Sequence, residues 1–196
     1  VYALVYTIHH YTGCRTKELL NLKWRHITIN PNDNAFDRKT NRIVHIPADN
    51  SKTGRSRDII APIGQQIERL IRWYREMGLE VDQKSDRYVF PRLTDTTKNE
   101  NIPTSDVAWT KRLKKVLEGA ERDGAIDLNG RNISNYCARH HHITEAIQRG
   151  VDIYDIALNC GTSLNYIEKT YSHITTLMRS KEPVSYTHLR AHETRE

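Results

Sequence analysis

The stretch YTGCRTKELLNLKW, from Tyr11 to Trp24, combines a turn signal with a helical one. Gly13 interrupts the apolar pattern that precedes it, as glycine often does at a turn. Beyond the glycine, apolar residues return at helical spacing, at Leu19, Leu20 and Leu22. The stretch therefore predicts a turn followed by a second helical segment.

Upstream of this stretch, VYALVYTIHH carries apolar residues at helical spacing, with neither a start methionine nor a capping residue. We therefore expect a helix cut in its middle, and a sequence that is the C-terminal part of a longer protein. Downstream, the short runs HITIN, RIVHIP and SRDIIAP are separated by the turn-rich segments NPNDN and DNSKTG. These runs predict a small antiparallel sheet with DNSKTGR at the tip of its last hairpin.

The remaining sequence is mostly helical in pattern. An amphipathic stripe in IGQQIERLIRWYREMG ends at Gly78. Ser105 can cap DVAWTKRLKKVLEGAER, whose inward face is predicted to carry Trp109, Leu113 and Leu117. Three more helices are expected in ISNYCARHHHITEAIQRG, VDIYDIALNCG and SLNYIEKTYSHI, and RYVF reads as a short strand. The predicted fold class is mainly α with a small antiparallel three-stranded β-sheet.

Bulk properties narrow the class of protein. The 196 residues fit one domain, and 30 Lys and Arg against 24 Asp and Glu give a net charge of +6. This charge permits a polyanionic partner such as nucleic acid without requiring one. No apolar run approaches the roughly 20 residues that cross a bilayer, so no membrane contact is predicted. Cys14, Cys137 and Cys160 are odd in number and far apart, which favours reduced thiols in a cytoplasmic protein.

The end of the sequence, PVSYTHLRAHETRE, follows no hydrophobic period. It resembles a read-through segment that recurs at the ends of unrelated partial sequences. We assign residues 1–183 to one domain and residues 184–196 to a non-native tail that takes no part in the fold.

Four stretches together resemble the catalytic domain of the tyrosine recombinases, the phage-integrase family. YTGCRTKELLNLKW resembles the family's first arginine motif, and SKTGRSRDI its lysine-bearing hairpin. ARHHHITEAIQRGVDIYDIA resembles its second arginine motif, and GTSLNYIEKTYSH its terminal motif. The family's nucleophilic tyrosine lies ten residues after the glycine of that last motif, which gives Tyr171 when counted from Gly161. The order and spacing of all four motifs match between Tyr11 and His173.

The resemblance implies a role for each motif. Tyr171 would attack a DNA phosphate and form a covalent 3′-phosphotyrosine, with no metal or cofactor. Arg15 and Arg139 would bind the non-bridging oxygens, because a guanidinium donates a fixed fork of hydrogen bonds and stays charged. Lys52 would be the general acid for the leaving 5′ oxygen. Tyr166 points to a different side of the helix from Tyr171 and is assigned to packing or the surface.

Four more residues would support this site. Glu18, three residues after the first arginine, would orient the active site rather than only pair along a helix. His140, next to the second arginine, would pack against the catalytic groups. Tyr136 occupies a slot where the family most often has histidine, and Thr162 a slot where histidine or tryptophan is usual. Both replacements predict slower cleavage rather than none.

The histidine run RHHH raises the alternative of a metal site, with His9, His10 and His173 as further candidate ligands. Adjacent helical residues diverge by about 100°, so the three histidines from 140 to 142 cannot all face one ion. Within residues 1–183, the part assigned to the domain, the spacings HxxxH and HExxH are absent. We therefore predict no metal.

Together these features predict a site-specific DNA recombinase or integrase that acts on double-stranded DNA. The resemblance implies a homotetramer assembled on two DNA sites. Two alternatives remain open: a catalytically degenerate DNA-binding relative, and a type I topoisomerase-like enzyme that nicks and rejoins strands. A metal-dependent hydrolase built on the histidines is the least favoured alternative.

Overall fold

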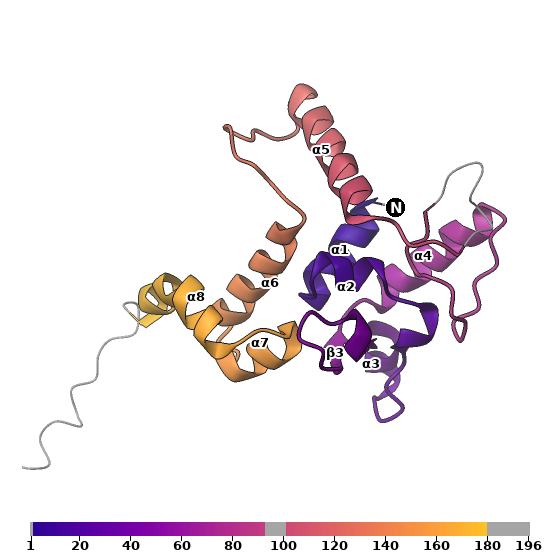
Figure 1. Ribbon diagram of the computed structural model, residues 1–196, viewed down its shortest axis with the longest axis horizontal. Helices are drawn as coiled ribbons and strands as arrows, with labels where there is room; N and C mark the ends of the chain where they lie inside the picture. The colour runs from indigo at the N-terminus through magenta and orange to yellow at the C-terminus, as the bar shows by residue number, and fades with distance from the viewer. Residues whose placement is uncertain (1, 93–100, 180–196) are drawn as a thin grey trace, which may run out of the picture.

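The computed structural model describes residues 2–92 and 101–179 and shows a mainly helical protein with one small sheet (Figure 1). Its N-terminal half begins with two helices and continues into the sheet. The elements are α1 (Tyr2–Thr12), α2 (Thr16–Leu20), η1 (Trp24–His26), β1 (Ile27–Thr28), α3 (Ala35–Thr40), β2 (Arg42–Ile46), η2 (Ala48–Asn50), β3 (Arg57–Ala61) and α4 (Gly64–Glu76). The turn predicted at Gly13 lies between α1 and α2, where the glycine has a φ of 58°.

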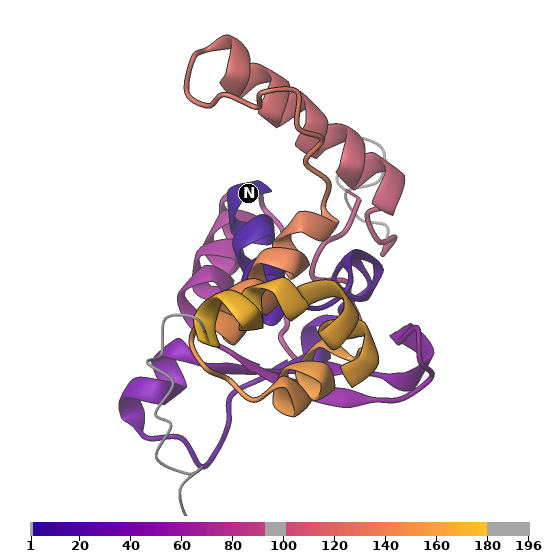
Figure 2. The same ribbon diagram turned by 90° about the vertical axis from the view of Figure 1, so that its left-hand side faces the viewer.

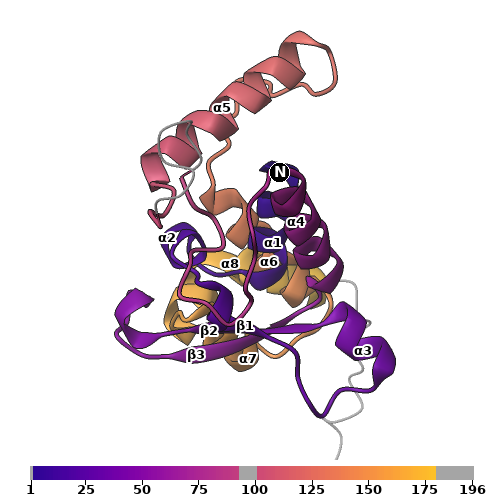
Figure 3. The ribbon, with the colours of Figure 1, turned by 90° about the vertical axis from the view of Figure 1, so that its right-hand side faces the viewer.

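The sheet confirms the prediction of three antiparallel strands. Its strand order is β1-β2-β3, with Val44 of β2 opposite Ile27 on one side and Ile59 on the other. In Figure 3 the sheet lies at the lower edge of the body, with α3 near one end and the turn between β2 and β3 at the other. The sequence did not predict α3, which Asn34 caps by accepting hydrogen bonds from the backbone N–H groups of Phe36 and Asp37.

A first hydrophobic core joins these elements. The predicted stripe of α4 is buried along its whole length, at Ile63, Ile67, Leu70, Ile71 and Tyr74. It packs with the leucines of the second helical segment and with the inward residues of β2 and β3. RYVF forms no strand: Tyr88 makes an isolated bridge with Lys23, and Val89 and Phe90 are buried in the first core.

Helix α5 (Asp106–Arg122) begins where predicted but packs less than predicted. Ser105 caps it by accepting a hydrogen bond from the backbone N–H of Ala108. Trp109 is buried in the first core, whereas Leu113 and Leu117 are only half-buried. Figure 1 shows the reason, because the rest of α5 extends away from the body.

The C-terminal part adds α6 (Tyr136–Gln148), α7 (Ile153–Cys160) and α8 (Leu164–Arg179), which lie together on one side (Figure 2). They enclose a second hydrophobic core built on Ile143, Ile156 and Ile167. Helix α6 joins the two cores because it packs on both α1 and α8. None of the helices within the described ranges is both long enough and apolar enough to cross a bilayer. The tail assigned to residues 184–196 lies outside the described residues.

Candidate active site

Glu18 is a buried carboxylate between two arginines. It is 1% exposed and belongs to the short helix α2. Arg15 donates to it twice, from its backbone N–H to Oε2 and from Nη1 to Oε1, both at 2.9 Å. Burial alone would raise the pKa of Glu18, but the hydrogen bonds from Arg57 and Arg15 outweigh burial and lower it. Glu18 is therefore a fixed anion that orients the Arg15 guanidinium.

Arg57 is the second arginine on this carboxylate, and sequence reasoning missed it. Its Nη2 donates to Glu18 Oε2 at 2.6 Å, and its Nε donates to the carbonyl of Asn159 at 2.9 Å. The guanidinium lies so close to Gly161 that a Cβ there would come within 2.7 Å of its Cζ. A usable signal existed, because Arg57 alternates with the buried Ile59 and Ala61 and so shares their inward face of β3.

The turn at Cys160 and Gly161 brings the two predicted catalytic arginines together. Arg15 Nη2 donates to the carbonyl of Gly161 at 2.6 Å. Arg139 Nη1 donates to the carbonyl of Cys160 at 2.6 Å and to that of Gly13 at 2.7 Å. Gly161 has a φ of 62°, a left-handed conformation that ends α7 and aims these carbonyls at the arginines.

Arg139 is completely buried, at 0% exposure. Its Nε has no hydrogen-bond partner among the described residues. A buried guanidinium with an unsatisfied N–H is costly, and an incoming anion would relieve that cost. Arg139 thus has the charge and a spare donor for a phosphate, but it is closed off from solvent in this arrangement.

Tyr171 lies against His140. Its hydroxyl oxygen is 2.5 Å from His140 Nδ1, and the residue is only 4% exposed, at the edge of the second core. Burial, followed by the neighbouring Tyr166 and Tyr136, raises the pKa of the phenol, and the Arg139 charge opposes this. Burial and the Arg139 charge lower the pKa of His140, so the imidazole is neutral at pH 7 and one of its nitrogens can accept a proton.

Three further residues singled out in the sequence, Tyr136, Tyr166 and Thr162, lie near His140, Tyr171 or the turn after α7. Tyr136 packs edge-on against His140, with ring centroids 4.7 Å apart. Tyr166 packs against the second core, and a hydrogen bond with Tyr136 raises its pKa. Thr162 is half-buried in the turn after α7, where its backbone N–H donates to the carbonyl of Ala157.

Lys52 is the one predicted catalytic residue that the structure leaves outside the group. It lies exposed on the turn between η2 and β3. The base of that turn is tied to α2, because Asn50 Nδ2 donates to the carbonyl of Glu18 at 2.9 Å. The lysine therefore sits on an anchored hairpin, with its side chain in solvent.

The side chains of the three consecutive histidines, His140 to His142, have different neighbours and do not converge on one point. His9 is buried on α1 and contacts the carbonyl of Cys14 through Nε2. His142 lies under Gly13, where a Cβ would collide with its ring. Burial lowers the pKa of both histidines to about 4, so both are neutral packing residues at pH 7. His10 of α1 stacks on His141 of α6, with ring centroids 4.7 Å apart.

Comparison with known proteins supports the resemblance seen in the sequence. The sequence model of the Phage integrase family matches residues 1–178. None of the curated proteins compared with the chain matches it.

Solved structures with a similar fold include the XerH site-specific recombinase bound to palindromic difH substrate in a post-cleavage complex. That match has a TM-score of 0.65 and 19% identity, and covers 91% of this chain and 44% of the other. The Tn1549 transposon integrase in complex with circular intermediate DNA matches with a TM-score of 0.60, 15% identity and coverage of 92% and 57%. XerA recombinase matches with a TM-score of 0.60, 16% identity and coverage of 93% and 57%. The chain thus spans about half the length of these proteins.

Proposed function

Because this chain belongs to the phage integrase family, we propose that it is the catalytic part of a site-specific DNA recombinase whose nucleophile is Tyr171. One observation carries the proposal, namely that the motif residues converge. Arg15 and Arg139 both donate to the turn at Cys160 and Gly161, and Tyr171 touches His140, the neighbour of Arg139. Residues far apart in the sequence thus form one group of arginines near a phenol.

The proposed chemistry is a transesterification. The phenolic oxygen of Tyr171 forms a bond to the phosphorus of a DNA phosphodiester while the bond to the 5′ oxygen breaks, which leaves a 3′-phosphotyrosine. The phenolic proton passes to His140, whose Nδ1 already lies 2.5 Å from the hydroxyl. Lys52 supplies a proton to the leaving 5′ oxygen. Rejoining reverses these steps, so the reaction needs neither a metal nor an external energy source.

The two catalytic arginines stabilise the charge that develops on the phosphate. Glu18 and Arg57 fix the plane of the Arg15 guanidinium, so that its outer face is preorganised. Arg139 exchanges its backbone carbonyl partners for phosphate oxygens. His140 supplies the base that Tyr136, a neutral phenol, cannot supply.

Double-stranded DNA is the proposed substrate, and a homotetramer on two DNA sites is the proposed assembly. The net charge of +6 supports a polyanionic partner. The XerH and Tn1549 structures are themselves complexes with DNA. The location proposed for such a protein is the cytoplasm, which agrees with three free cysteines.

Covalent trapping tests this function. The protein is incubated with supercoiled plasmid, once in EDTA and once with added Zn²⁺, and is quenched with SDS. We expect protein covalently joined to DNA in both buffers, loss of the adduct with Tyr171→Phe, and its retention with Tyr166→Phe. Retention with Tyr171→Phe and loss with Tyr166→Phe would contradict the choice of nucleophile.

A second candidate function is DNA binding without catalysis. The burial of Tyr171 and Arg139 favours it, because a phosphate cannot reach either group in this arrangement. The same trapping experiment separates the two functions. DNA retardation without any adduct would support binding alone.

A further inference from the structure

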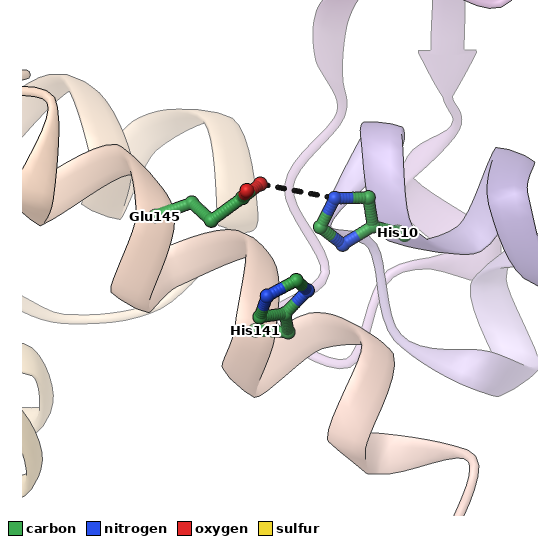
Figure 4. Close-up of side chains that lie close together, drawn as sticks. All are labelled: His10, His141 and Glu145. Carbon is green, nitrogen blue, oxygen red and sulfur yellow. Dashed lines mark ion pairs between the residues drawn. The ribbon is translucent and has the colours of Figure 1, made fainter.

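A second group of ionisable side chains lies between α1 and α6, outside the proposed active site. It consists of His10 from α1 with His141 and Glu145 from α6 (Figure 4). His10 Nε2 lies 3.1 Å from Glu145 Oε2, and the rings of His10 and His141 stack with centroids 4.7 Å apart. One ligand atom from each residue lies within 4.8 Å of the other two.

The spacing along α6 explains why two of the three groups share a face. His141 and Glu145 are four residues apart, about one helical turn, so both point toward α1. The prediction of no metal rested on the divergence of adjacent histidines and on the spacings HxxxH and HExxH. This group uses one histidine and one carboxylate on α6, and the third ligand comes from another helix.

The ligand types and the distances between the ligand atoms suit zinc. Two imidazoles and a carboxylate are ordinary zinc ligands, and a tetrahedral ion with bonds of 2.0–2.2 Å holds its ligand atoms about 3.3 Å apart. The pair of His10 and Glu145 already has that separation. The widest separation of 4.8 Å must close by roughly 1.5 Å. His141 is exposed, so its ring can turn inward without displacing a packed neighbour.

The surroundings leave room for the ion. A hollow of about 220 Å³ opens on one side of the group, where His10, Glu145 and Arg149 line it and His141 does not. Arg149 Nη2 lies 3.5 Å from Glu145 Oε1, which leaves Oε2 as the ligand oxygen.

We propose that His10, His141 and Glu145 bind one Zn²⁺ ion, with water in the fourth position. The ion joins α1 to α6 and so stabilises the helix that carries Arg139 and His140. It takes no part in the proposed strand transfer, and the site does not depend on that function.

Zinc titration by calorimetry, with the metal-free chain, tests the proposal. We expect one Zn²⁺ per chain and a rise in Tm when zinc is added, because the ion binds only the folded site. His141→Ala and Glu145→Gln should each weaken binding by about tenfold or more. His173→Ala, which removes an exposed histidine on α8, is the matched control and should bind like the unaltered protein.

Two outcomes would overturn the site. The first is no zinc binding by the unaltered chain. The second is unchanged binding in both His141→Ala and Glu145→Gln, with circular dichroism showing that both are folded. A Co²⁺ spectrum separates this site from a cysteine site, because imidazole and carboxylate ligands give no sulfur-to-metal charge-transfer band.

Discussion

Glu18 shows how a single residue can connect distant parts of the candidate active site. Its carboxylate receives hydrogen bonds from Arg15 of the first motif and from Arg57 of β3, while Arg57 also holds the carbonyl of Asn159 at the end of α7. A carboxylate at 1% exposure is tolerated only with such partners. The pair of arginines therefore fixes the sheet, α2 and α7 at one point.

Arg57→Gln is expected to lower the free energy of unfolding by about 2 kcal/mol at pH 7. It removes charge-assisted hydrogen bonds from a buried anion and leaves the Asn159 carbonyl without its donor. Urea unfolding measures the loss. Arg55→Gln, on the same hairpin but exposed, is the control and should change stability by less than about 0.5 kcal/mol.

The effect of Arg57→Gln should also depend on pH. The folded pKa of Glu18 is lowered from its ordinary value of 4.5, so the stability that its ionised form contributes is present above that value and is lost as pH falls through the folded pKa. The difference between the two proteins should therefore shrink in acid. A difference that stays constant from pH 7 to about pH 3 would mean that Arg57 stabilises the fold without acting through Glu18.

Motif spacing assigns residues to the candidate site without giving the partners of their side chains. Arg15, Glu18 and Arg139 could be chosen from motif spacing. Arg57 could not be chosen that way, because its partner Glu18 lies 39 positions away along the chain. Only the alternation of β3 marked it as inward-facing, and an inward arginine at a strand start has no partner that a single sequence can reveal.

At the scale of elements, α5 departs most from its sequence pattern. Its apolar positions predict a buried face, yet only Trp109 is buried and the helix extends away from the body (Figure 1). Periodicity reports which face is apolar and not what covers it. The helix α3 was missed for the opposite reason, because all six of its residues are polar or exposed and it begins at a polar cap, Asn34.

The exposed part of α5 is expected to contact the DNA backbone. Lys111, Lys114 and Lys115 are exposed on it, with Lys114 only 3.6 Å from Glu118 in a surface ion pair. Replacing all three lysines with alanine should weaken DNA binding for every sequence tested. The slope of log K against log salt should fall by about 2 to 3, measured by fluorescence anisotropy.

The matched control for α5 is α4, whose exposed Arg69, Arg72 and Arg75 form an equally basic surface. Replacing these three arginines with alanine lowers the net charge by the same amount. If both triple variants lose affinity equally, net charge explains the binding and α5 has no particular role.

At the scale of the whole molecule, the arrangement of the two hydrophobic cores limits how a phosphate can reach Arg139 and Tyr171. The first core holds α1, α2, the sheet and α4, and the second holds α6, α7 and α8. Arg139 and Tyr171 lie at the junction of the cores and are closed to solvent, at 0% and 4% exposure. A phosphate can contact both groups only after one of the cores opens. We expect the second core to open, because it has fewer buried residues and opening it costs less free energy.

DNA binding is therefore expected to loosen α8 while the sheet stays closed. Hydrogen exchange followed by mass spectrometry, with and without duplex DNA at low salt, measures this directly. Amides of residues 163–174 should exchange faster in the complex, because the second core must open before a phosphate can reach the buried Tyr171, whereas β2 and β3 should remain unchanged. If these α8 amides stay equally protected in a complex that still forms the covalent adduct, then the phosphate reaches Tyr171 without movement of α8. In that case the opening lies instead in the turn at Cys160 and Gly161, which holds both arginines.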